Sequence, residues 1–167
     1  MAIEYRGKIS YPPLFDEAAQ IIGRQRMEYN NERRAKVARY DRGSEENNLR
    51  IDSLGIWGEL VFSYYLTSKG IQHECQRLLS DNPIADWDVK INGKTIDVKA
   101  FNPKRNSIII SHEAHLKKPM DFYAFVQPSG DYTAHVWVAS YADVDKWEVK
   151  TLNPKYGPAI VKDVSYE

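Results

Sequence analysis

The stretch ADWDVKINGKTIDVKA, residues 85–100, decides the fold of this chain. At its centre stands Asn92-Gly93, the strongest short signal for a hairpin closed by a two-residue type I′ turn. The flanking residues are β-branched or aromatic at alternate positions, which is typical of strands. The stretch therefore predicts two antiparallel strands, Trp87–Ile91 and Lys94–Phe101, in a fixed register.

That register gives the two faces of the hairpin opposite characters, because side chains along a strand alternate between faces. One face is apolar and is predicted to join the core: Trp87, Val89, Ile91, Ile96, Val98 and Ala100. The other face is polar and charged: Asp86, Asp88, Lys90, Thr95, Asp97 and Lys99. If the pairing continues to the ends of both strands, Asp88 lies directly opposite Asp97.

Two carboxylates that face each other across a sheet repel and destabilise it. A hard divalent cation between Asp88 and Asp97 would remove this repulsion, and Mg²⁺ typically takes one or two protein carboxylates together with substrate phosphate. Lys99 is on the same face, where its side chain could stabilise charge on a phosphate, or hold and deprotonate an attacking water. The competing interpretation is a solvated strand face whose lysines screen the aspartates.

One further carboxylate stands upstream of the hairpin in an unusual setting. The segment LGIWGELVFSYYLTSK lies within a predicted helix, Ser53–Lys69, which is apolar nearly all round and ends before Gly70. Glu59 lies in the middle of this segment. A charge there must have a partner, face a cleft or be protonated.

Together these residues resemble the PD-(D/E)XK nuclease superfamily, and ADWDVKINGKTIDVKA is similar to its central hairpin. The resemblance rests on Gly58-Glu59-Leu60 in a helix, on Asp88, and on Asp97-Val98-Lys99 at the end of a hairpin strand. It covers residues 53–127, under half of the chain. Trp87 stands where the superfamily has its name-giving proline, and Asp97 replaces the commoner glutamate.

The resemblance implies a divalent-metal-dependent deoxyribonuclease that uses Mg²⁺ or Mn²⁺; it favours an endonuclease over an exonuclease and leaves both open. Asp88 and Asp97 would ligate the metal, Glu59 would complete the site directly or through water, and Lys99 would be the catalytic lysine. The alternative is a catalytically silent module of the same fold that binds DNA or a protein partner. The implied partner is DNA, and a homodimer would reconcile the small size of the chain with a duplex substrate.

The predicted fold class is α/β, with a restriction-endonuclease-like core, a mixed central β-sheet flanked by helices, and an extra N-terminal helix. We expect one domain over residues 1–167, with a helical extension at 1–50, the core at 53–127 and C-terminal strands at 128–167. The first helix is predicted from Asp16, as N-cap, to about Tyr40. The other predicted elements are strands at Gln72–Leu78, Ser107–Ser111, Phe122–Gln127 and Thr133–Ala139, and a short helix at Glu113–Lys118.

Composition and charge exclude several classes of protein. The chain has 167 residues, one cysteine and no long apolar run, so neither a disulfide framework nor a membrane span is expected, and we expect a cytoplasmic protein. Its 23 basic and 23 acidic residues cancel, and residues 121–167 hold 4 basic against 7 acidic. A surface for a polyanion should therefore lie within the first 120 residues.

A DNA substrate needs cations beyond the metal site. The candidates are Lys104 and Arg105, just past the strand of Lys99, and Arg33 and Arg34 on the first helix; weaker ones are Lys36, Arg39 and Lys117-Lys118. A zinc site at His112 and His115, completed by His73, Cys75 or His135, is a remoter alternative, and surface or loop histidines are the simpler interpretation.

Overall fold

The centre of the molecule is a six-stranded mixed sheet, seen in a computed structural model that describes residues 3–36, 43–76 and 87–167, with 32–36 as backbone only. The strand order is β1-β7-β6-β4-β3-β2. β4 and β6 run parallel, and each of the other neighbouring pairs is antiparallel. Their bounds are β1 Glu4–Ser10, β2 Glu74–Cys75, β3 Val89–Ile91, β4 Lys94–Ala100, β6 Phe122–Pro128 and β7 Thr133–Ser140. The predicted α/β class with a mixed central sheet is confirmed.

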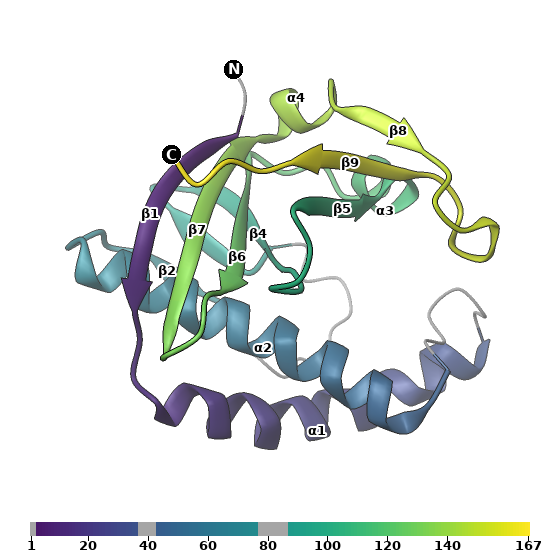
Figure 1. The fold of residues 1–167 in the computed structure, drawn as a ribbon, viewed down its shortest axis with the longest axis horizontal. Coiled ribbons are helices and arrows are strands. Elements are labelled where there is room, and N and C mark those ends of the chain that lie inside the picture. Colours follow the sequence, from purple (N-terminus) through teal and green to yellow (C-terminus); the bar gives the residue numbers. More distant parts are fainter. Residues whose placement is uncertain (1–2, 37–42, 77–86) are drawn as a thin grey trace.

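A long helix, α2 (Glu45–Ser68), packs against one face of this sheet, and a second long helix, α1 (Leu14–Lys36), packs against α2 (Figure 1). Ile56 and Phe62 of α2 are buried in one cluster with Val98 of β4 and Val126 of β6. Burying this apolar surface is the main stabilising contribution on this side, at about 25 cal/mol per Å². Residues of α2 are therefore held firmly against β4.

The opposite face of the sheet carries a second, three-stranded sheet of order β5-β9-β8 (Figure 1). These strands are β5 Ser107–Ser111, β8 Glu148–Lys150 and β9 Ala159–Asp163; the short helices are α3 His112–Lys117, α4 Tyr141–Val144 and the 3-10 helix η2 Pro154–Tyr156. Phe125 and Trp137 of the large sheet pack with Ile160 of β9 in a separate core. The molecule thus has three layers, with the central sheet in the middle.

Both long helices begin earlier than predicted. Asp16 is in the first turn of α1 instead of capping it, because the helix already begins at Leu14. The α2 helix begins eight residues before Ser53, where the hydroxyl of Ser44 accepts the backbone N–H of Asn47 as an N-cap. Two glutamates in the first turn also favour this start, since negative charge stabilises a helix N-terminus. The predicted end of the first helix at Tyr40 lies outside the described residues.

Most predicted strands are found, and a few elements were missed. Ser107–Ser111 is confirmed as predicted, and β6 and β7 agree with their predictions to within one residue. Only the two residues of β2 represent the predicted strand Gln72–Leu78, whose end lies outside the described residues. The prediction missed β1, which pairs with β7 and places residues near the N-terminus in the central sheet.

Among the described residues, no helix is long and apolar enough to cross a membrane.

Candidate metal and phosphate site

The hairpin follows its predicted register only near the turn. Ile91 pairs with Lys94, and Val89 pairs with Ile96. The next residue breaks the pattern, because the Asp88 N–H also donates to the Ile96 carbonyl, at 2.9 Å. Two residues of one strand then oppose one residue of the other, which is the arrangement of a β-bulge. The predicted direct pairing of Asp88 with Asp97 is therefore wrong, and the predicted pair Asp86–Lys99 lies outside the described residues.

The bulge also reverses the face on which the preceding residue lies. Lys90 Nζ is 4.2 Å from the centroid of the Trp87 ring. Residues three apart in a regular strand point to opposite faces. Trp87 therefore lies with Lys90 instead of on the predicted core face, because the extra residue of a bulge shifts the alternation.

At the bulge, the side chain of Asp88 contacts the backbone of the neighbouring strand, β4. Its Oδ2 accepts the backbone N–H of Val98 at 2.7 Å. Burial, together with the negative charges of Asp97 and Glu59, raises the pKa of this carboxyl to about 7, although Lys99 and the Val98 hydrogen bond act in the opposite direction. Asp88 is thus brought into one electrostatic cluster with Asp97, although not by the predicted pairing.

Asp97 and Lys99 are neighbours on one face of β4, as the alternation predicts. Lys99 Nζ is 2.6 Å from Asp97 Oδ2, and the two side chains are 43% and 15% exposed. Burial lowers the pKa of Lys99, but the carboxylates of Asp97 and Asp88 act in the opposite direction and leave it raised. Asp97 Oδ2 is itself buried and, in the described structure, accepts no hydrogen bond of regular geometry despite the nearby ammonium.

Glu59 reaches this cluster because α2 approaches β4 very closely. A Cβ added to Gly58 would lie 2.8 Å from the Cβ of Ala100, so only glycine permits the approach. Arg26 of α1 forms a bidentate ion pair with Glu59, in which Nη1 donates to Oε1 at 2.8 Å and Nη2 donates to Oε2 at 3.2 Å. Burial raises the pKa of Glu59 more than Arg26 lowers it, and the charge of Asp97 adds to the rise.

Sequence reasoning did not identify Arg26 as a member of this cluster. The residue belongs to a helix 33 positions before Glu59, and its neighbours in sequence include other arginines of equal appearance. Only the crossing of α1 over α2 selects it. No local spacing rule could have found this pair.

The carboxylates fit a divalent metal in the chemistry of their donors. Among the described residues, the buried Asp97 Oδ2 has the Lys99 ammonium as an ion-pair partner at 2.6 Å but no hydrogen bond of regular geometry, and Asp88 has a second oxygen beside the one bound to Val98. Both are hard oxygen ligands of the kind that Mg²⁺ prefers. In the described part of the chain, however, no three His, Cys, Asp or Glu side chains are arranged to hold a metal together. The fit is therefore to a site with two protein carboxylates.

The predicted phosphate-binding cations fall into two groups. Lys104 and Arg105 are exposed in the turn that follows β4, five and six positions after Lys99. The buried side chain of Gln127 holds this turn by donating to the carbonyls of Asn102 and Arg105, at 3.2 and 2.8 Å. Arg33 and Arg34 belong to α1, but their side chains lie outside the described residues.

His115 of the alternative zinc site has another role. His115 is fully buried, where its Nδ1 is 2.9 Å from the Tyr123 hydroxyl and its Nε2 is 3.2 Å from Asp145 Oδ1. It also stacks on Tyr141, with ring centroids 4.1 Å apart. His115 is therefore a histidine of the core with both nitrogens occupied.

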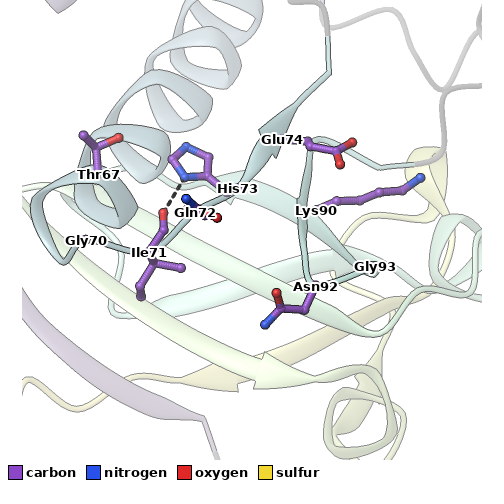
Figure 2. Close-up of a pocket in the computed structure, with 9 residues that line it drawn as sticks. All are labelled: Thr67, Gly70, Ile71, Gln72, His73, Glu74, Lys90, Asn92 and Gly93. Atoms are coloured by element: carbon purple, nitrogen blue, oxygen red, sulfur yellow. Dashed lines mark hydrogen bonds between the residues drawn. The ribbon is translucent and has the colours of Figure 1, made fainter.

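An open groove of about 670 Å³ lies at the hairpin turn, near the C-terminal end of α2 (Figure 2). Its lining consists of Thr67, Gly70, Ile71, Gln72, His73, Glu74, Lys90, Asn92 and Gly93. None of the four candidate catalytic residues lines it. The charge cluster and the groove are therefore separate features of the surface.

Comparisons of the chain with protein-family models, with curated proteins and with solved structures give no match.

Proposed function

We propose that this protein is a divalent-metal-dependent deoxyribonuclease with a restriction-endonuclease-like core. The observation that carries the proposal is the cluster of Glu59, Asp88, Asp97 and Lys99. These residues come from a helix, a bulge and a strand, and their charges shift one another's pKa values. Three partly buried carboxylates beside a lysine are costly to maintain without a function.

The proposed roles follow from the donors that each residue offers. Asp88 and Asp97 would hold Mg²⁺ or Mn²⁺, and Glu59 would support the site directly or through water. When bound, such a metal polarises a phosphoryl oxygen and lowers the pKa of a bound water. This is the chemistry that hydrolysis of a phosphodiester requires.

Lys99 is better suited to stabilise charge than to remove a proton. With no metal bound, the carboxylates of Asp97 and Asp88 raise its pKa, so its side chain is an ammonium at neutral pH. A protonated lysine can donate to a phosphate oxygen on which charge develops, and it cannot act as a general base. We therefore assign Lys99 the electrostatic role and leave activation of the water to the metal site.

The second candidate is a catalytically silent module that binds DNA or a protein. Arg26 and Lys99 already neutralise Glu59 and Asp97, and such pairing keeps the cluster stable without a metal. A binding module would use the same exposed cations at Lys104 and Arg105. The two candidates differ in turnover, which is directly measurable.

The test is cleavage and binding of DNA by Asp97→Asn, with Asp131→Asn as the matched control. Asp131 is an exposed turn residue with φ 49°, a conformation that asparagine tolerates. We expect Asp97→Asn to lose Mn²⁺-dependent cleavage while it retains DNA binding, and the control to keep both. A wild-type protein that binds DNA without cleaving it would favour the silent module.

A further inference from the structure

The Arg26–Glu59 pair is built into the crossing of the two long helices. A Cβ on Gly23 of α1 would lie 2.6 Å from the Cα of Ser53, so the helix backbones are in close contact one turn before Arg26. The guanidinium lies beside Gly55 of α2, where Arg26 Nη1 would make an ordinary contact of 3.6 Å with a Cβ placed on that residue. The Arg26 side chain is only 23% exposed. Its position is thus determined by the packing of the helices.

With every carboxylate ionised, the described residues of the site carry one negative charge in excess when no metal is bound. Three carboxylates, Glu59, Asp88 and Asp97, face two cations, Arg26 and Lys99. A divalent metal would turn this balance into one positive charge in excess, which complements one phosphodiester group. Without Arg26, the metal-loaded site would be neutral. Arg26 therefore makes the metal-loaded site positive instead of neutral, and a positive site attracts a DNA phosphate.

We propose that Arg26 is the internal counter-ion of this site: it competes with the divalent metal for the negative charge of Glu59, and it makes the metal-loaded site positive towards DNA. This inference rests on the proposed function. It adds to the cluster a residue of α1, outside the segment that resembles the nuclease hairpin. Arg26 suits the role because its planar fork holds both oxygens of the carboxylate, which a lysine could not do.

The test compares Arg26→Gln with Arg24→Gln, an exposed residue on the same helix whose replacement changes the net charge equally. Mn²⁺ is titrated into each full-length protein by isothermal calorimetry. We expect Arg26→Gln to bind Mn²⁺ about tenfold more tightly than wild type, since one charge at short range shifts an ionic equilibrium by about one to three decades. Arg24→Gln should bind within about twofold of wild type. An unchanged or weaker affinity in Arg26→Gln overturns the proposal.

A second variant keeps the test decisive if Arg26→Gln does not fold, which thermal unfolding without metal would reveal. Arg26→Lys retains the charge but holds the carboxylate through a single donor group. We expect it to bind Mn²⁺ about threefold more tightly than wild type, between the other two proteins. An Arg26→Lys affinity equal to that of wild type would then overturn the proposal.

DNA binding tests the second half of the inference. With Ca²⁺ at saturation in place of Mn²⁺, we expect Arg26→Gln to bind a short duplex at least threefold more weakly than Arg24→Gln. Equal binding contradicts this half. If the wild type binds no divalent cation at all, the proposed function fails as well; if it binds Mn²⁺ and loses it in Asp97→Asn, but Arg26→Gln is unchanged, only this inference fails.

Discussion

At the level of one residue, Asp88 shows how the charge cluster lowers the stability of the folded protein. Its carboxyl has a pKa of about 7 because it is buried beside Asp97 and Glu59, compared with a usual value of 3.8. Between these two pH values the unfolded chain has released a proton that the folded protein keeps. Stability therefore falls as the pH rises from about 4 to 7, and it stays lowered above pH 7.

We predict that Asp88→Asn stabilises the metal-free protein at pH 8 by roughly 1–3 kcal/mol and has little effect near pH 4. The asparagine Oδ1 can still accept the Val98 N–H, so the bulge keeps its hydrogen bond. Urea unfolding in EDTA at both pH values measures the difference, with Asp131→Asn as the control. A stabilisation of equal size at the two pH values would mean that Asp88 does not titrate as described.

The sequence predicted which charged side chains lie close together better than it predicted how they are arranged. Alternation along β4 correctly placed Asp97 and Lys99 on one face. The contact of Asp88 with β4 was expected from a regular pairing with Asp97. No pattern in the sequence DVKINGKTID predicts the bulge at Asp88 and Val89 that brings it about. Arg26 could not be predicted, since its partner is chosen by a helix crossing and not by spacing in the chain.

At the level of elements, the contact between α2 and β4 determines where Glu59 lies. Gly58→Ala would place a methyl group 2.8 Å from the Ala100 Cβ, a distance that forces the helix away from the strand. We predict a loss of about 1–3 kcal/mol in the free energy of unfolding, as is usual for an overpacked core. The displacement should also weaken Mn²⁺ binding.

Gly55→Ala is the matched control for this prediction. It lies on the same helix, and the nearest atom to its added Cβ is Arg26 Nη1 at 3.6 Å, an ordinary contact. Alanine favours a helix over glycine by about 1 kcal/mol, so this variant should be neutral or more stable. Equal destabilisation of both variants, measured by urea unfolding, would contradict the close approach at Gly58.

Elements with strong local signals were predictable, and elements defined by distant partners were not. The Asn92-Gly93 turn, Ser107–Ser111 and the helix end before Gly70 each carry their signal in a few residues. The first strand, β1, has only a weak alternation and becomes a strand by pairing with β7, more than 120 residues away. The start of α2 was not predicted, because a serine followed by polar residues, as at Ser44, is typical of turns as well as of helix N-caps.

At the level of the whole molecule, the net charge of zero means that DNA affinity has to come from local cations. Lys104 and Arg105 are exposed on a turn that Gln127 holds in place. We predict that replacing both with glutamine weakens DNA binding about equally for all sequences and lowers the slope of log K against log salt by about 2. Fluorescence anisotropy between 50 and 200 mM salt measures this slope.

The control for this pair is Lys146→Gln combined with Lys150→Gln, two exposed lysines of the C-terminal part of the chain. Removing them changes the net charge by the same amount but should leave the slope unchanged. A slope that falls equally in both double variants would show that DNA responds only to the total charge.

The mixed sheet was predictable as a class, but its order was not. Parallel pairing of β4 with β6 requires the chain to cross over through β5 and α3. No local residue pattern predicts that β4 and β6 are neighbours in the sheet. The second sheet joins β5 to β9, about 50 residues later, and β9 was not predicted. Long-range pairing of this kind depends on the packing of the whole core.

The most direct test of the proposed function is cleavage of supercoiled plasmid and of linear single-stranded DNA by the purified protein. The assay runs with Mg²⁺, Mn²⁺ or EDTA, and it compares wild type with Lys99→Ala and with the control Lys146→Ala. We predict metal-dependent cleavage that EDTA abolishes, that falls at least about a hundredfold in Lys99→Ala, and that Lys146→Ala retains. Cleavage that persists in EDTA or in Lys99→Ala, or no cleavage of either substrate with either metal, would contradict it.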